Sequence, residues 1–294
     1  MLWAVFTLIA AAAQTARNAM QRELTATLGT VGATHVRFLF GFPFALIFLA
    51  GLVAVTGSAL PNPPPLFWPW VLAGAFSQIA ATATMLSVMG QRSFVVAYAY
   101  IKTEPVSVAL FGLIFLGDKI TPLSGAAILI ATIGVIVISL KRGASQVSTT
   151  RSTIIGLLSG ALFAMSAIGF RGAILTLHLP DFILAATFTV TVGLVIQAAV
   201  LSLYLWLRDP KVLHDIRRAW KPSLFAGFMG AFASEFWFLG FAITSAANVR
   251  TLALVEVLFA QGVSRFVFKQ PTTAREGAGI VLVVVGVALL VWAY

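Results

Sequence analysis

Charged side chains inside long apolar runs are the first residues of this sequence that could do chemistry. Glu104, Glu235 and Glu256 each lie within such a run, and Lys102 precedes Glu104 by two residues. A charge is costly within a membrane-spanning helix, so it faces the interior of a helix bundle and marks an ion or substrate pathway. Loss of solvation favours the protonated form of a carboxyl group. These carboxylates are therefore candidates for proton coupling, with a structural ion pair as the alternative.

One short segment combines several polar groups on a single expected helix. Tyr98 and Lys102 are four residues apart and share a face, as do Tyr100 and Glu104. Lys102 and Glu104 point about 200° apart on a helix, so we do not expect them to pair with each other. Pro105 removes a backbone hydrogen bond and favours a kink, which suits a gate beside a cavity.

Two further runs carry polar residues at helical spacing. Gln14 and Arg17 share a face of the first run, and Arg171 takes the equivalent place in the second half of the chain. Guanidinium groups in a cavity of low dielectric suit a substrate carboxylate, with anchoring at the membrane interface as the alternative for Arg171. Gln78 and Thr82 share a face of the third run and could line a cavity or bond across helices.

The remaining polar and aromatic residues complete three groups of candidates: substrate-binding, proton-coupling or gating, and carboxylate-binding. Trp237 lies deep in its run, as Tyr98 and Tyr100 do, and such rings can stack on a flat ligand. His35 and Arg37 stand at the start of the second run, where interfacial anchoring is the favoured interpretation. The predicted substrate-binding residues are Gln14, Gln78, Thr82, Tyr98, Tyr100, Lys102 and Trp237. The predicted proton-coupling or gating residues are Glu104, Pro105, Glu235 and Glu256, and the carboxylate-binding candidates are Arg17 and Arg171.

The composition indicates what must position these residues. Of 294 residues, 60% are hydrophobic, 10% are charged and none is cysteine. This balance excludes a disordered chain, a disulfide scaffold, a zinc–thiolate site and a cysteine-based catalyst. The apolar runs are continuous rather than alternating, which excludes a transmembrane β-barrel. We therefore predict an all-α membrane protein.

Ten runs are long enough to span a bilayer as helices. They are Leu2–Met20, Ala33–Val55, Phe67–Met89, Phe94–Leu116, Leu123–Leu140, Thr153–Leu175, Phe182–Leu207, Pro222–Thr244, Val249–Phe268 and Gly277–Trp292. Small residues such as Ala131, Gly134, Gly279 and Gly286 indicate close helix packing rather than a site.

The chain also resembles itself. A shift of 152 residues aligns Glu104 with Glu256 and Gly134 with Gly286. We predict two five-helix repeats, residues 1–142 and 153–294, joined by a linker at 143–152. Because five spans is an odd number, the repeats must be inverted relative to each other, a plan common among secondary transporters with a site near the midplane.

Charge and motifs narrow the function further. The net charge of +10 gathers in loops after odd-numbered runs, as the positive-inside rule expects, so no nucleic-acid partner is predicted and the termini are placed outside. The sequence has no nucleotide loop, metal cluster or hydrolytic triad, so we expect no enzyme activity, no cofactor and no metal.

The segment from Tyr100 through Glu104-Pro105 to Leu116-Gly117-Asp118, followed by Gly125 to Gly134, resembles the EamA-type repeat of the drug/metabolite transporter superfamily. The second half matches more weakly, since Val257 follows Glu256 where the first half has proline. The resemblance implies an exporter of amino acids or related metabolites in the bacterial inner (plasma) membrane, and one branch exports aromatic amino acids. It also implies cytoplasmic termini, against the charge pattern.

The resulting hypothesis is alternating-access export of neutral or aromatic amino acids through a cavity between the repeats, with the bilayer, a small substrate and protons as partners. One alternative is an exchanger of phosphorylated or nucleotide-linked sugars, which would need a deep cluster of basic residues, and only Lys102 is clearly deep. Another class of alternative is a membrane-embedded enzyme or a structural subunit.

Overall fold

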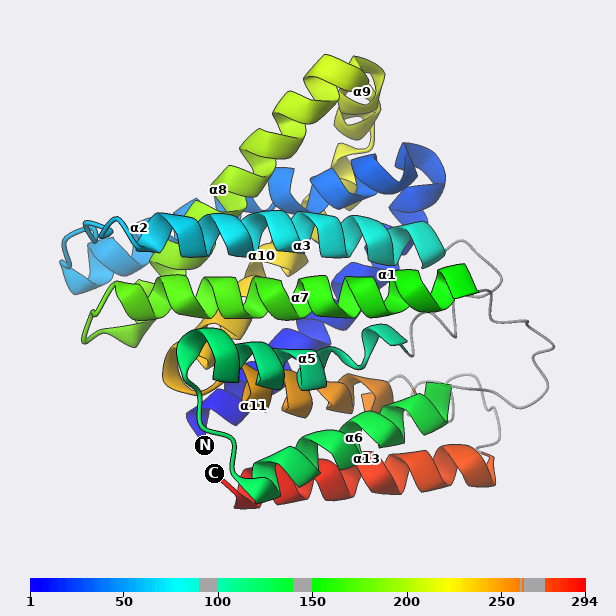
Figure 1. The fold of residues 1–294 in the computed structure, drawn as a ribbon. Helices are drawn as coiled ribbons and strands as arrows, with labels where there is room; N and C mark the ends of the chain where they lie inside the picture. The colour runs from blue at the N-terminus through cyan, green and yellow to red at the C-terminus, as the bar shows by residue number, and fades with distance from the viewer. Residues whose placement is uncertain (90–99, 140–149, 260, 262–272) are drawn as a thin grey trace.

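The computed structural model describes residues 1–89, 100–139, 150–259, 261 and 273–294, and in these residues every regular element is a helix (Figure 1). A π-helical turn, Gly112–Leu116, follows α5, and a 3₁₀ turn, Ala253–Val255, follows α11. The α-helices are α1 (Leu2–Leu39), α2 (Phe42–Thr56), α3 (Phe67–Met89), α5 (Glu104–Phe111), α6 (Pro122–Ser139), α7 (Thr150–Thr176), α8 (Phe182–Arg208), α9 (Pro210–Arg218), α10 (Trp220–Ile243), α11 (Ala246–Leu252) and α13 (Ala274–Trp292).

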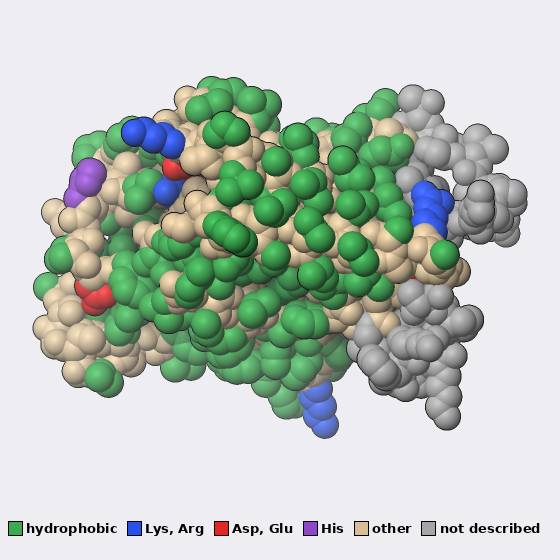
Figure 2. Space-filling view, turned by 90° about the horizontal axis from the view of Figure 1, so that it is seen from below, with side chains coloured by type: hydrophobic (Ala, Val, Ile, Leu, Met, Phe, Trp, Pro, Cys, Tyr) green, Lys and Arg blue, Asp and Glu red, His purple; other side chains and the backbone are tan. Residues whose placement is uncertain are grey.

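The helices are suited to a bilayer. Within the described residues, seven are long and apolar enough to cross a membrane. Large apolar side chains cover much of the face seen in Figure 2, where charged side chains are few and lie toward the margins. On α6 and α13, Ile133 and Val281 leave 51% and 60% of their surfaces exposed, as side chains facing lipid do. The protein is therefore an all-helical, multi-pass membrane protein.

The first helix reverses its direction at Gly29. This glycine has φ 67° and ψ 177°, a conformation that only glycine adopts readily. Beyond it the chain returns, and the Gln21 side-chain amide donates to the Ala33 carbonyl at 3.0 Å. The predicted turn between the first two spans is thus in the right segment, but the helix continues past Met20 to Leu28. The second predicted span is also interrupted, because α1 ends at Leu39 and α2 begins at Phe42.

Two predicted spans can be followed only in part. Residues 94–99 of the fourth lie outside the described residues, and its helix is interrupted by a turn at Lys102–Thr103 before α5 begins. Pro105 occupies the first turn of α5, where its missing N–H costs nothing. The ninth begins as α11 and tightens into the 3₁₀ turn just before Glu256. The predicted linker, residues 143–152, lies mostly outside the described residues.

The two halves of the chain are interleaved. Three close helix pairs, α1 with α10, α3 with α7 and α6 with α13, each join a helix of the first half to one of the second. In the repeat, α1 corresponds to α7, α3 to α10 and α6 to α13. Exchanging the two halves therefore turns the α1–α10 pair into the α7–α3 pair, and the α6–α13 pair into itself. Glycine makes the approach close, since a Cβ at Gly134 would lie 2.7 Å from the Val283 nitrogen. The predicted close packing through small residues is confirmed.

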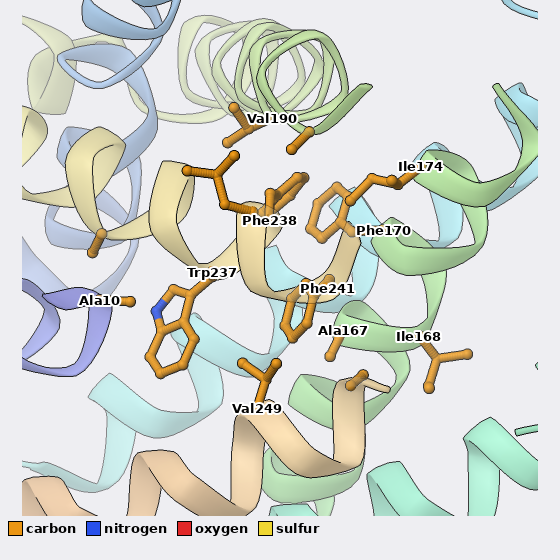
Figure 3. Packing of buried hydrophobic residues seen from close by; sticks show 14 of the residues in the cluster. Ala10, Ala167, Ile168, Phe170, Ile174, Val190, Trp237, Phe238, Phe241 and Val249 are labelled. Atoms are coloured by element: carbon orange, nitrogen blue, oxygen red, sulfur yellow. The ribbon is translucent and has the colours of Figure 1, made fainter. Parts of the chain in front are cut away.

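An aromatic core lies where α7, α8 and α10 meet (Figure 3). Phe170 and Phe238 are fully packed, with ring centroids 4.7 Å apart. Trp237 and Phe241 project from α10 toward the helix that carries Val249, which is α11 (Figure 3). This core fixes α10 and α11 on one side of a polar cavity.

Candidate functional site

A polar cavity lies among helices of both halves of the chain. Its volume is about 30 Å³, room for one or two water molecules. Four of the lining side chains are cationic and one is a carboxylate. The lining residues are Gln14, Arg17, Asn18, Arg37, Gln78, Met85, Ile101, Lys102, Glu104, Phe163, Trp237 and Arg250.

Two crossed ion pairs connect the halves at this cavity. Lys102 pairs with Glu256, and the Arg250 Nε lies 3.1 Å from the Glu104 Oε1. Each pair joins a residue of the first half to one of the second, and the four side chains are 6–13% exposed. Lys102 forms its ion pair with Glu256, while Glu104 forms its own with Arg250. The carboxylates that the repeat aligns are each neutralised by a cation of the other half.

Both pairs stand beside interruptions in helices. Lys102 lies in the turn before α5, and Glu256 directly follows the 3₁₀ turn. Helix interruptions near the midplane supply backbone groups and hinges at the binding sites of inverted-repeat transporters. The charged side chains of Lys102 and Glu256 therefore lie at points where the helix is broken and the backbone can bend.

Aromatic rings hold the Arg250 guanidinium in place. Its central carbon lies 4.7 Å from the Trp237 ring centroid and 5.4 Å from that of Phe241. Stacking of this kind restrains a guanidinium without consuming its hydrogen-bond donors. The Trp237 indole in turn donates to the Gln14 Oε1 at 3.2 Å, which ties α10 to α1.

The side of the cavity formed by α3 carries amide and hydroxyl groups. Gln78 accepts a hydrogen bond of 2.9 Å from Gln197 of α8. Thr82, one turn further along α3, accepts one of 3.3 Å from the Arg37 Nη1. Gln78 thus lines the cavity, and Thr82 supports one of the lining arginines from behind.

The structure brings six predicted residues to the cavity and leaves others elsewhere. Arg171 lies outside the lining, where its Nη1 donates to the Asp118 Oδ1 at 2.6 Å and its Nε donates to the Thr244 carbonyl at 2.9 Å. Glu235 accepts a hydrogen bond of 2.5 Å from Thr187 of α8. The six that line the cavity are Gln14, Arg17, Gln78, Lys102, Glu104 and Trp237.

The remaining predicted residues are close to the cavity or beyond description. Tyr100 is partly buried beside Ile101 and is not among the described lining residues. Pro105 is buried directly after Glu104, and Glu256 reaches the cavity through Lys102. Tyr98 lies outside the described residues.

Sequence reasoning did not place Arg37 or Arg250 at the cavity, although both line it. The interfacial interpretation of Arg37 is wrong, because its side chain is 3% exposed and lines the cavity. His35, assigned to the interface with it, is fully buried against Ser202. Arg250, which is not among the predicted site residues, is 8% exposed beside Trp237. Their positions depend on the reversal at Gly29 and on contacts between the halves, which no local pattern reveals.

The arrangement is suited to binding rather than to bond chemistry. Within the described residues, no group of three metal-binding side chains could hold an ion. The cavity offers guanidinium and ammonium donors for an anionic group, a carboxylate for a cationic group, and an indole for an apolar one. A site for a small metabolite needs several hundred cubic ångströms, so its walls must move apart to admit one.

Comparisons with known proteins agree with this description. The EamA-like transporter family matches residues 1–140 and 150–292. A search of curated proteins finds no significant match. One solved structure, titled "Crystal structure of protein", is similar with a TM-score of 0.73 over 98% of this chain and 96% of its own, at 16% identity. That likeness concerns the fold.

Proposed function

This chain belongs to the EamA-like transporter family, a family of transporters rather than enzymes, and from that premise we propose that it exports neutral or aromatic amino acids by alternating access. Family membership implies secondary transport of a small molecule across a membrane. The amino-acid substrate, the outward direction and a bacterial plasma membrane are our proposal, as is kinship with the branch that exports aromatic amino acids.

The observation that carries the proposal is the cavity between the halves. Its opposite charges match the two ends of a zwitterion, with Arg17 or Arg37 for the carboxylate and Glu104 for the ammonium group. Trp237 and Phe163 supply apolar surface for an aromatic side chain. Groups of both signs in one small cavity favour an amino acid over a purely apolar solute.

Alternating access requires two halves that rock against each other. We place the halves at residues 1–142 and 153–294 as inverted repeats of five spans each. The exchange-symmetric helix pairs support this arrangement, since a two-fold axis through the cavity would relate α1 and α10 to α7 and α3. The crossed ion pairs would then have to separate as the halves move.

Proteoliposome uptake tests the function. Labelled tryptophan, phenylalanine, threonine and alanine are offered to the purified protein, with and without an imposed pH gradient. We expect saturable uptake that favours the two aromatic amino acids and rises with the gradient. If none of the four is taken up, the amino-acid assignment is wrong, although the family assignment stands.

A carboxylate variant tests the role of Glu104. Glu104→Gln keeps the shape but removes the charge that faces Arg250, so we expect slower uptake and a weaker response to the pH gradient. The exposed Glu23 provides the matched control, and Glu23→Gln should behave as the wild type does. Wild-type rate and pH response in Glu104→Gln would remove Glu104 from the mechanism.

A further inference from the structure

Two arginines of α1 meet on one glycine of α10. A Cβ built on Gly230 would lie 3.2 Å from the Arg37 Cγ and 3.4 Å from the Arg17 Cδ, so both stems rest on this part of the α10 backbone. In a straight helix, residues 17 and 37 would be about 30 Å apart at 1.5 Å per residue. The reversal at Gly29 brings them together. The fold therefore builds a pair of guanidinium groups from distant parts of one helix.

Arg37 has unused hydrogen-bonding capacity within this pair. Its side chain is 3% exposed, and its Nε has no hydrogen-bond partner among the described residues. Its Nη1 donates to the Thr82 hydroxyl at 3.3 Å and to no other group of the described residues. All nine carboxylate side chains of the sequence fall in the described ranges, and none of them lies within 4.0 Å of Arg37 as an ion pair.

The charged neighbours of Arg37 are cations, and the face of one aromatic ring, Phe38, has its centroid 5.1 Å from the central carbon of the guanidinium. Arg17 and Arg250 both repel it, and Arg250 is directed at Glu104 rather than toward Arg37. A buried cation without a counterion is costly, and an incoming oxyanion would supply both the missing charge and the missing acceptors. Guanidinium groups match carboxylate and phosphate oxygens with paired hydrogen bonds.

We propose that Arg37 and Arg17, seated on Gly230, form an oxyanion subsite, so that the transported substrate carries a carboxylate or phosphate group. This inference rests on the transport function proposed above and narrows its substrate class. It also revises the case against phosphorylated substrates, because the cavity holds four deep cations where the sequence indicated one. An amine that lacks an acidic group is then a poor substrate.

Matched small molecules test the chemistry of the subsite. Uptake of labelled phenylalanine by the proteoliposomes is measured against unlabelled phenethylamine, which lacks the carboxylate, and 3-phenylpropionate, which lacks the ammonium group. We expect competition from 3-phenylpropionate and little from phenethylamine. Glycerol 3-phosphate forms the phosphate arm, and stronger competition from it would assign the subsite to phosphate. Equal competition by phenethylamine and 3-phenylpropionate would overturn the subsite while leaving the transport function in place.

A glycine variant tests the location of the subsite. Gly230→Ala adds a methyl group beneath both arginine stems and should raise the KM of an acidic substrate about tenfold, the loss of one charge-assisted hydrogen bond. Gly240 of the same helix is the matched control, because its Cβ would lie 3.2 and 3.4 Å from the methyl groups of Val249. Gly240→Ala should therefore leave the KM within about twofold of the wild type, since an apolar contact carries no part of the oxyanion interaction. Equal effects of both variants, or of neither, would contradict the assignment.

A binding measurement separates failure of the subsite from failure of the transport function. The thermal unfolding of the purified protein in detergent is followed with 3-phenylpropionate or inorganic phosphate. Binding should raise the midpoint for the wild type and not for Arg37→Gln, with a smaller rise for Arg37→Lys, which keeps the charge but loses the planar group. A shift without uptake would retain the subsite and refute the transport function. No shift with either probe would refute the subsite.

Discussion

Exchanging the two halves turns the α1–α10 pair into the α3–α7 pair, yet the two pairs differ in what lies at their contact. We call α1–α10, which carries the arginines that line the cavity, the hollow side, and α3–α7 the sealed side. Between α3 and α7, a Cβ on Gly169 would lie 2.6 Å from the Gly74 nitrogen, so backbone meets backbone. Between α1 and α10, Gly230 faces the stems of Arg17 and Arg37 instead, and the polar cavity opens beside them. Two interfaces that the repeat relates can thus differ, one closed by backbone contact and the other carrying the cations of a polar cavity.

The arginines that the repeat aligns differ in the same way. Arg17 is 2% exposed and lines the cavity. Arg171 is 12% exposed and is held by Asp118 and the Thr244 carbonyl, where it joins the loop before α6 to the end of α10. Arg17, on the hollow side, therefore lines the cavity. Arg171, on the sealed side, instead links the two halves through its ion pair with Asp118.

The largest expected effect concerns the charges that stabilise the hollow side. Lys102→Met leaves Glu256 buried without its cation, and removing one partner of a buried pair costs about 3–5 kcal/mol. The thermal unfolding midpoint of the purified protein should fall accordingly. The reversed pair, Lys102→Glu with Glu256→Lys, should recover part of the loss. An unfolding midpoint equal to that of the exposed-site control Lys119→Met would mean that the pair contributes nothing.

The next effect separates the two arginines. In the proposed oxyanion subsite Arg17 donates to the substrate, so Arg17→Gln should lower kcat/KM roughly 10- to 100-fold, at about 1.5–3 kcal/mol for a hydrogen bond from a charged donor. Arg171→Gln should lower the unfolding midpoint and change kcat/KM much less, because Arg171 is absent from the described lining. Uptake kinetics and thermal unfolding of both variants make the test. The distinction between hollow and sealed sides is wrong if the two variants lose kcat/KM equally.

The smallest effect concerns the glycines alone. Gly169→Ala places a methyl group against the α3 backbone, and overpacking of this kind costs about 1–3 kcal/mol. The methyl group of Gly230→Ala would lie 3.2 and 3.4 Å from flexible arginine stems and at an ordinary 3.6 Å from the Arg37 carbonyl, so its cost in stability should be smaller even though its effect on KM is larger. Denaturation of the two variants in the same detergent compares them. A Gly230 variant less stable than the Gly169 variant would show that the hollow side is as tightly packed as the sealed one.

The sequence predicts much of the site because of one physical constraint. Lys102, Glu104 and Arg17 stand in apolar runs, where a charge has to face the bundle interior, and the structure brings all three to one cavity. The repeat likewise indicates Glu256, which reaches the cavity through Lys102. The cost of placing a charged side chain in an apolar run depends only on that run. The sequence of the run is therefore enough to predict that the charge faces the bundle interior.

The rest of the site depends on geometry that no run contains. Arg37 reaches the cavity because Gly29 adopts positive φ, and nothing in the flanking sequence distinguishes this glycine from the others in the first half. The partner of each carboxylate lies in the opposite half, about 150 residues away, and is chosen by how the halves interleave. Arg171 follows the repeat in sequence but meets Asp118 in space.

The interleaved helix pairs also determine when each pair can form during synthesis of the chain. α10 follows α1 by about 180 residues, which at roughly 5–20 residues per second delays their pairing by about 10–40 s. During that interval α1 stands in the bilayer with Arg17 and Arg37 still lacking the helix that supports them. A nascent chain that stalls after its first half therefore holds Lys102 and Glu104 before Glu256 and Arg250, their partners from the second half, have been made. Completion of the second half supplies both partners, so these two ion pairs form only once both halves are present.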